Sequence, residues 1–139
     1  MPSFHKIKPL SNFDIEKMCK KLKIKNFKGV YMRDELKGKM SGNESLILNI
    51  DHSKNSGTHW VCLFNKSKFC LYFDSFGFPP PVEVIKYCKT KNINLYCSSF
   101  RIQWDNEVIC GHYCIYVLHR LSSGYDFYEI LNELFRYKK

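Results

Sequence analysis

Four side chains occur in an order that suits nucleophilic catalysis by a thiol: His59, Asp74, Gln103 and Cys110. A thiol nucleophile needs a general base, the base needs a group that orients it, and the oxyanion formed on the substrate needs hydrogen-bond donors. A cysteine, a histidine, an aspartate and a glutamine can fill these four roles. The sequence therefore predicts a catalytic site in which Cys110 is the nucleophile.

Cys110 stands directly before Gly111, where a predicted loop gives way to a helical pattern over residues 111–121. A free thiol has a pKa of about 8.5, and the positive end of a helix dipole or a neighbouring imidazolium lowers it. Gly111 permits a close approach of the backbone to a substrate carbonyl. A lone cysteine is more often a small buried hydrophobe, so the other three residues are what favour a nucleophile here.

His59 begins an apolar, strand-like run, and Asp74 ends the next one. Residues 59–64 and 69–73 are rich in aromatic and β-favouring residues, and the polar segment 65–68 between them indicates a hairpin. In an antiparallel hairpin the start of one strand lies beside the end of the next, so we expect His59 and Asp74 within reach of each other. A carboxylate in that place fixes the imidazole tautomer and stabilises its protonated form.

Gln103 lies seven residues before Cys110, and its amide is a donor that can act together with the backbone N–H of Cys110 at the developing oxyanion. The residues between them, 104–109, form the predicted connection between the two halves of this hole. Taken alone, Gln103 fits a polar residue on an exposed strand face better than an oxyanion donor. Trp60, next to His59, fits a shield over the imidazole, a cation–π partner or a core residue.

With 139 residues, of which 45% are hydrophobic and 16% aromatic, the chain is expected to be one folded domain over residues 1–139. No apolar run approaches the roughly 20 residues of a membrane-spanning helix, and the N-terminus lacks the apolar stretch of a signal peptide. The seven cysteines are an odd count without regular spacing, which argues against a secreted disulfide framework. We therefore expect an intracellular or virion protein, monomeric and not membrane-bound.

The net charge is +9, from 22 basic and 13 acidic residues, and lysines are dense from Lys17 to Lys39. Such a balance fits either a soluble basic surface or a polyanionic partner. Nucleic acid, bound through the basic surface, is thus a candidate partner beside a protein substrate.

Apolar spacing and capping residues predict four helices, over residues 12–22, 82–88, 111–121 and from 127 onwards. Strands are predicted where aromatic and β-favouring residues gather, over 46–50, 59–64, 69–73 and 95–103. The segment 23–42 is predicted as loops around the short run 29–36. Strands enclosed between helices indicate an α+β domain, with a central, mostly antiparallel sheet.

The combined pattern resembles the cysteine proteases of the adenain and ubiquitin-like-protein protease superfamily. The order His, acidic residue, Gln, Cys matches, whereas papain-like enzymes place the cysteine before the histidine. The matching motifs are Gly57-Thr58-His59-Trp60, Phe73-Asp74-Ser75-Phe76-Gly77, Gln103-x6-Cys110-Gly111 and the segment 27–36. The resemblance covers residues 11–121 and is nearest to adenovirus-type maturation proteases, including relatives in Polinton (Maverick) elements and adintovirus-like viruses.

This resemblance implies a thiol endopeptidase with Cys110 as nucleophile, His59 as base, Asp74 as its partner and Gln103 as oxyanion donor. It also implies cleavage after small glycine-containing sequences in virion precursor proteins, in the host nucleus or cytoplasm or in the virion. No cofactor is required for the chemistry, and members of the family can be activated by DNA and by a short peptide from a capsid protein.

Two features depart from the adenovirus enzymes. The acidic partner Asp74 is an aspartate, as in the ubiquitin-like-protein proteases, whereas adenovirus enzymes carry glutamate. The chain is also short for an adenain, and the length that it lacks is a candidate for the surface on which the peptide docks. The main alternative is therefore a deubiquitinase or SUMO-type deconjugating protease that uses the same four residues.

Two interpretations outside the proteases stay open. A non-enzymatic nucleic-acid-binding module would account for the lysines and aromatic residues, but not for the ordered quartet. A zinc site built on Cys110, Cys114 and either His112 or His119 is the other interpretation. Its spacing matches no common structural zinc site, and both cysteines lie beside the apolar face of a predicted helix.

Overall fold

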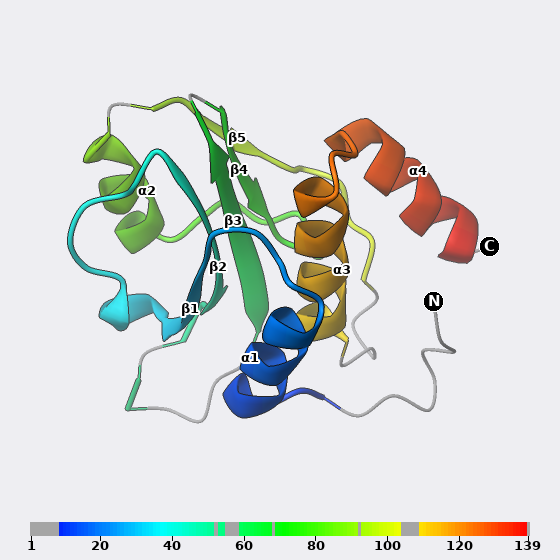
Figure 1. The fold of residues 1–139 in the computed structure, drawn as a ribbon, viewed down its shortest axis with the longest axis horizontal. Coiled ribbons are helices and arrows are strands. Elements are labelled where there is room, and N and C mark those ends of the chain that lie inside the picture. Colours follow the sequence, from blue (N-terminus) through cyan, green and yellow to red (C-terminus); the bar gives the residue numbers. More distant parts are fainter. Residues whose placement is uncertain are drawn as a thin grey trace.

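The computed structural model describes residues 9–51, 53–54, 59–67, 69–91, 93–103 and 109–138. A five-stranded sheet lies at the centre, with helices on both of its faces (Figure 1). The strands lie in chain order: β1 (Phe27–Met32), β2 (Asn43–Asn49), β3 (Trp60–Lys66), β4 (Phe69–Phe73) and β5 (Leu95–Cys97). One face carries α1 (Asn12–Lys21), α3 (Cys110–Ser122) and α4 (Phe127–Lys138), and the other carries α2 (Val82–Lys89) and the 3-10 turn η2 (Arg33–Glu35). The predicted α+β class is confirmed.

The two central strand pairs, β2 with β3 and β3 with β4, are antiparallel, as the predicted hairpin requires. The two outer pairs, β1 with β2 and β4 with β5, are parallel. The edge strand β1 is missing from the prediction, which places loops around residues 29–36. The strand predicted over 95–103 is too long, because after Ser98 the N–H groups of Ile102 and Gln103 donate to the carbonyl oxygen of Ser75 instead of a strand.

Alternation along the strands divides the buried apolar side chains between two cores. The core under α1, α3 and α4 includes Ile15, Ile47, Cys62, Phe73, Tyr113, Leu118 and Ile130. The core under α2 includes Leu46, Leu48, Val61, Leu63, Tyr72 and Val84. Each face of the sheet is therefore covered, and β3, at the centre, contributes to both cores.

The predicted helix starts are observed. Ser11 caps α1, because its hydroxyl accepts from the Asp14 N–H at 3.2 Å while the Asp14 carboxylate accepts from the Ser11 N–H at 3.0 Å. The Asp126 carboxylate accepts from the Glu129 N–H at 2.8 Å at the start of α4. α3 begins at Cys110 itself, one residue earlier than predicted. Within the described residues, no helix is long and apolar enough to cross a membrane.

Candidate active site

The site lies where the start of β3, the end of β4 and the start of α3 meet. The antiparallel register pairs Cys62 with Phe73, which brings the residues just before β3 beside those just after β4. His59 Nε2 lies 2.6 Å from Asp74 Oδ1, and both side chains are buried. The proximity of His59 and Asp74 that the hairpin predicts is confirmed.

A tight turn after β4 presents the Asp74 carboxylate to His59. The Phe76 N–H donates to Asp74 Oδ1 at 2.8 Å, and the Gly77 N–H donates to the Asp74 carbonyl oxygen at 2.8 Å. Gly77 has a φ of +76°, and a Cβ there would lie 3.0 Å from two backbone carbonyl oxygens. Only glycine fits this position without displacement of the backbone, so the turn depends on the Asp-Ser-Phe-Gly sequence.

The imidazole of His59 is held on its face as well as at its edge. Its ring stacks on Phe76, with centroids 4.4 Å apart and an interplanar angle of 21°, and the Arg101 guanidinium lies 5.1 Å from the centroid of the same phenyl ring. Burial lowers the pKa of His59, but its hydrogen bonds to Asp74 and Cys110 raise that pKa from 6.5 to about 9. The site thus favours the imidazolium form.

Cys110 is the first residue of α3 and is largely buried. Its sulfur accepts from the Trp60 backbone N–H at 3.4 Å. Burial raises the pKa of the Cys110 thiol. Hydrogen bonds from His59 and from the backbone N–H groups of Trp60 and Gly111 lower the pKa by a larger amount, so the net shift is downward. The upward shift on His59 and the downward shift on Cys110 both favour a thiolate–imidazolium pair over the neutral pair.

Gly111 and Trp60 pack against each other beside this pair. A Cβ on Gly111 would lie 3.3 Å from Trp60 Cδ1 and 3.4 Å from Ile15 Cδ1, so the missing side chain lets α1 and Trp60 approach α3 closely. The Trp60 indole N–H donates to the Leu10 carbonyl oxygen at 3.2 Å. Of the three roles open to Trp60, the structure favours the core residue, and it gives Gly111 a packing role that the sequence does not indicate.

Gln103 is buried, not on an exposed strand face. Its Oε1 accepts from the Ser75 hydroxyl at 2.5 Å, and its backbone N–H donates to the Ser75 carbonyl oxygen at 3.0 Å. Gln103 is therefore hydrogen-bonded to the turn that holds Asp74, through Ser75, a member of the Asp74 motif for which the sequence predicts no role. Of the predicted connection 104–109, residues 104–108 lie outside the described residues, as do Gly57 and Thr58 of the His59 motif.

The described residues include both histidines of the zinc interpretation, His112 and His119, and the structure does not support a zinc site there. Among the described residues, no three His, Cys, Asp or Glu side chains gather closely enough to hold a metal ion. Cys114 is fully buried, and burial raises the pKa of its thiol well above the usual value. His112 is partly buried, and burial lowers its pKa.

Two solved structures have the same fold. The chain matches the ASFV pS273R protease with a TM-score of 0.68 and 18% sequence identity, over 88% of this chain and 61% of that one. It matches the SUMO protease Ulp1, with the catalytic cysteine of that protein oxidized to a sulfinic acid, with a TM-score of 0.56 and 14% identity, over 91% and 74% of the two chains. The chain therefore has the fold of these two proteases. No protein-family model and no curated protein matches the sequence.

A cavity of about 440 Å³ lies beside Trp60, the neighbour of His59 in the chain. It is lined by Trp60, whose backbone N–H contacts the Cys110 sulfur, by the ends of β1 and β2 at Met32 and Asn49, and by Leu10 before α1. Trp60 is thus the residue that this cavity shares with the surroundings of the thiol.

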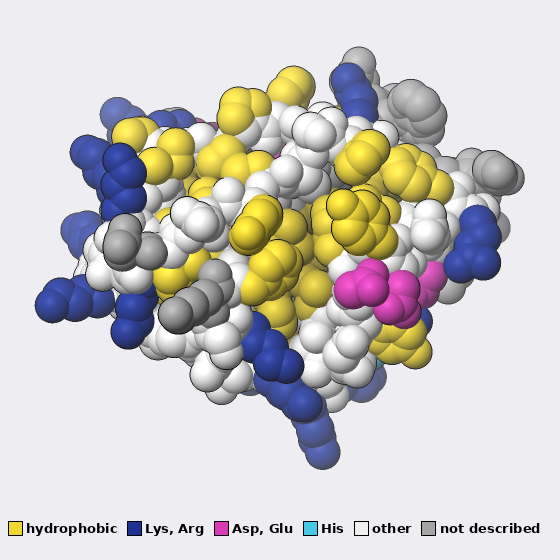
Figure 2. All heavy atoms as spheres, turned by 90° about the horizontal axis from the view of Figure 1, so that it is seen from above, with side chains coloured by type: hydrophobic (Ala, Val, Ile, Leu, Met, Phe, Trp, Pro, Cys, Tyr) yellow, Lys and Arg dark blue, Asp and Glu magenta, His cyan; other side chains and the backbone are white. Residues whose placement is uncertain are grey.

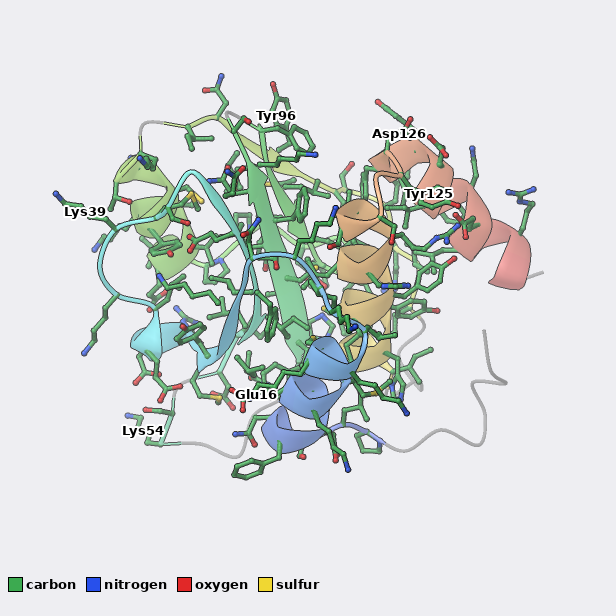
Figure 3. The ribbon with its side chains drawn as sticks, viewed as in Figure 1. Glu16, Lys39, Lys54, Tyr96, Tyr125 and Asp126 are labelled. Carbon is green, nitrogen blue, oxygen red and sulfur yellow. The ribbon has the colours of Figure 1, made fainter. Side chains whose placement is uncertain are left out.

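A second cavity, of about 340 Å³, lies between the β5 edge of the sheet and α4 and contains none of the four predicted residues. Four of its lining side chains are exposed aromatics: Phe69, Tyr96, Phe100 and Tyr128. Figure 2 shows apolar side chains gathered on this face, and Figure 3 places Tyr96 on β5 and Asp126 at the start of α4. His59, Asp74, Gln103 and Cys110 are also absent from the lining of the first cavity, which is connected to them through Trp60.

Proposed function

We propose that this protein is a cysteine endopeptidase in which Cys110 is the nucleophile, His59 the general base and acid, Asp74 the orienting carboxylate and Gln103 an oxyanion donor. The observation that carries the proposal is the chain of contacts from Asp74 through His59 to Cys110. Asp74 accepts from the imidazole at 2.6 Å, and the imidazole is hydrogen-bonded to the thiol. The likeness of the fold to two cysteine proteases supports it.

In the proposed reaction the Cys110 thiolate attacks the scissile carbonyl carbon, and the electron pair of the C=O bond moves to the oxygen. The Cys110 backbone N–H and the Gln103 amide donate to that oxyanion. Collapse of the intermediate breaks the C–N bond, and His59 gives its proton to the leaving amine. His59 then takes a proton from water, the hydroxide attacks the thioester, and the thiolate leaves. Asp74 keeps the imidazole oriented throughout.

The proposed substrates are proteins with small glycine-containing sequences, cleaved during maturation of a virion in the host nucleus, the cytoplasm or the particle. The similarity to the ASFV protease and the resemblance of the motifs to adenovirus-type enzymes support this choice. The second candidate is removal of ubiquitin or a ubiquitin-like modifier, which the similarity to a SUMO protease over 91% of this chain and the aspartate at position 74 favour. Glycine-containing peptide reporters tested beside ubiquitin and SUMO reporters separate the two.

Nucleic acid is part of the proposal as a partner and activator, supported by the net charge of +9. Figure 2 shows lysine and arginine side chains around the rim of one face, and Figure 3 shows Lys39 and Lys54 pointing away from the body of the protein. If duplex DNA activates the enzyme, the rate of peptide cleavage should rise with DNA and the effect should weaken as salt increases. An unchanged rate at low salt would remove DNA from the proposal.

The test of the proposed chemistry is competitive alkylation with limiting iodoacetamide at pH 6, with mass spectrometry to rank the cysteines. Two of them make the test sharp. Cys97 is an exposed residue, but partial desolvation of its thiol and the nearby Cys88 raise its pKa. Cys110 is buried, and the pKa of its thiol is lowered. A thiolate site predicts that Cys110 is labelled first and that His59→Ala abolishes this preference. Labelling of Cys97 ahead of Cys110 would overturn the assignment.

A further inference from the structure

The turn after β4 carries two neighbouring side chains with different partners. Asp74 accepts from His59, and Ser75, the next residue, donates to Gln103. Ser75 is completely buried. Its hydroxyl lies 2.5 Å from Gln103 Oε1, and its carbonyl oxygen accepts from the N–H groups of Ile102 and Gln103 at 2.8 and 3.0 Å. Three hydrogen bonds thus join this turn to the segment that carries Gln103.

The orientation of the Gln103 amide decides whether it can stabilise an oxyanion. A carboxamide has an acceptor end and a donor end of nearly the same shape, and half a turn about its last carbon–carbon bond exchanges them. Only the NH2 end can donate to an oxyanion. Because the Ser75 hydroxyl donates to Oε1, the acceptor end of Gln103 faces Ser75 and the Nε2 donor is directed away from it.

We propose that Ser75 is a positioning residue for the reaction: its hydroxyl fixes the rotamer of the Gln103 amide so that the donor end faces the oxyanion. This inference rests on the proposed function, because it assumes that Gln103 serves the oxyanion. The turn after β4 would then orient two catalytic groups: the His59 imidazole through Asp74, and the Gln103 amide of the oxyanion hole through Ser75.

A second buried serine, Ser98, serves as a comparison for Ser75, because its hydroxyl makes no such hydrogen bond within the described part of the chain. Ser98 is 5% exposed, and its Oγ has no hydrogen-bond partner within the described part of the chain. Its backbone N–H donates to the Tyr72 carbonyl oxygen at 3.1 Å, so its main chain is as firmly held as that of Ser75. Ser98→Ala is therefore the matched control for Ser75→Ala, since both variants remove one buried oxygen atom.

The experiment measures four quantities in Ser75→Ala and Ser98→Ala: kcat and KM on a peptide reporter, the rate of Cys110 alkylation at pH 6, and the affinity for a peptide aldehyde. The aldehyde forms a carbon–sulfur bond to Cys110, and its carbonyl electron pair moves to an oxygen that lies in the oxyanion hole. Iodoacetamide reacts with displacement of iodide and forms no oxyanion.

For Ser75→Ala we expect kcat to fall about 10- to 100-fold, no more than the lower end of the about 10²- to 10³-fold loss that removal of a whole oxyanion donor produces. Affinity for the aldehyde should fall by a similar factor, while KM and the alkylation rate stay at wild-type values. Ser98→Ala should leave all four quantities unchanged. An unaltered alkylation rate also shows that the variant is folded, because the Cys110 thiolate depends on His59 and Trp60.

The same variant in a Gln103→Ala background separates positioning from a direct role. If Ser75 acts through Gln103, the double variant is no slower than Gln103→Ala alone. A further loss of kcat in the double variant would overturn the proposal, as would wild-type kcat and aldehyde affinity in Ser75→Ala. Should Ser75→Ala fail to fold, Ser75→Cys keeps the side-chain shape with a weaker donor and should show a smaller loss in the same direction. Absence of preferential Cys110 alkylation in the wild type would instead contradict the proposed function itself.

Discussion

Replacement of Asp74 by asparagine is expected to remove the charge that keeps His59 protonated while the shape of the turn is retained. Asp74 Oδ1 accepts from His59 Nε2 at 2.6 Å and from the Phe76 N–H at 2.8 Å. The carbonyl oxygen of an asparagine can accept the same two hydrogen bonds. Asp74→Asn therefore differs from the wild type in one negative charge beside the imidazole.

The size of the effect follows from the displaced pKa of His59. Burial lowers this pKa, but the hydrogen bonds and charges of Asp74 and Cys110 raise it from 6.5 to about 9. At about 1.4 kcal/mol per pKa unit, the folded protein favours the imidazolium by on the order of 3 kcal/mol. An opposite charge at this range accounts for a shift of about 1 to 3 units. With a loss of about 2 units, the protonated fraction of His59 at pH 8 falls from about nine-tenths to about one-tenth.

The assay is the pH dependence of kcat/KM on a peptide reporter, whose alkaline limb reports loss of the proton from His59. We expect this limb at about pH 9 in the wild type, and about 1 to 3 units lower in Asp74→Asn. At pH 8 the variant should be about tenfold slower for this reason alone. The matched control is Asp126→Asn, because the Asp126 carboxylate accepts from the Glu129 N–H at the start of α4 and asparagine caps a helix equally well. An alkaline limb that coincides in Asp74→Asn and the wild type would refute the reasoning.

Three other outcomes are expected. Cys110→Ala should abolish cleavage of a peptide reporter and leave the melting temperature unchanged. Cleavage at the wild-type rate in this variant would exclude Cys110 as the nucleophile. Gly77→Ala should lower the free energy of unfolding by on the order of 3 kcal/mol in urea titration. Gly38→Ala, at a φ of +84° with open space around it, should cost only about 1 to 2 kcal/mol, and equal costs would show that the carbonyl contacts of Gly77 are unimportant. Because the folded state raises the pKa of His59, the stabilisation from its proton is complete below pH 6.5 and is lost as pH rises through about 9, which thermal melts over that range will detect against His59→Ala.

The hairpin that joins His59 to Asp74 could be predicted because its pairing is local. Two strand-like runs separated by a short polar segment pair in a single antiparallel register, and the register places one strand start beside the other strand end. The starts of α1 and α4 were equally accessible, since Ser11 and Asp126 act on N–H groups three residues away. These features depend on neighbours in the chain and therefore leave a pattern in the sequence.

The edge strands were beyond such reasoning. β1 contains Gly29, lies at the edge of the sheet and pairs in parallel with β2, so its hydrogen bonds come from a strand that follows only after a long connection. At the other edge, residues after Ser98 look like a continuing strand in the sequence. They turn instead to Ser75, 27 residues before Ile102, and this contact exists only in the folded chain.

The sequence by itself determined the chemistry on offer: the types and order of His59, Asp74, Gln103 and Cys110, and the helix start that favours a thiolate. Tertiary structure alone decided the environment of these groups. It brought the Trp60 N–H to the Cys110 sulfur and the Ser75 hydroxyl to the Gln103 amide. It also buried the His59 imidazole beside Asp74 and Cys110, which together raise its pKa. The reason is physical: residue types set which hydrogen bonds are possible, whereas burial and the orientation of donors depend on contacts between segments far apart in the chain.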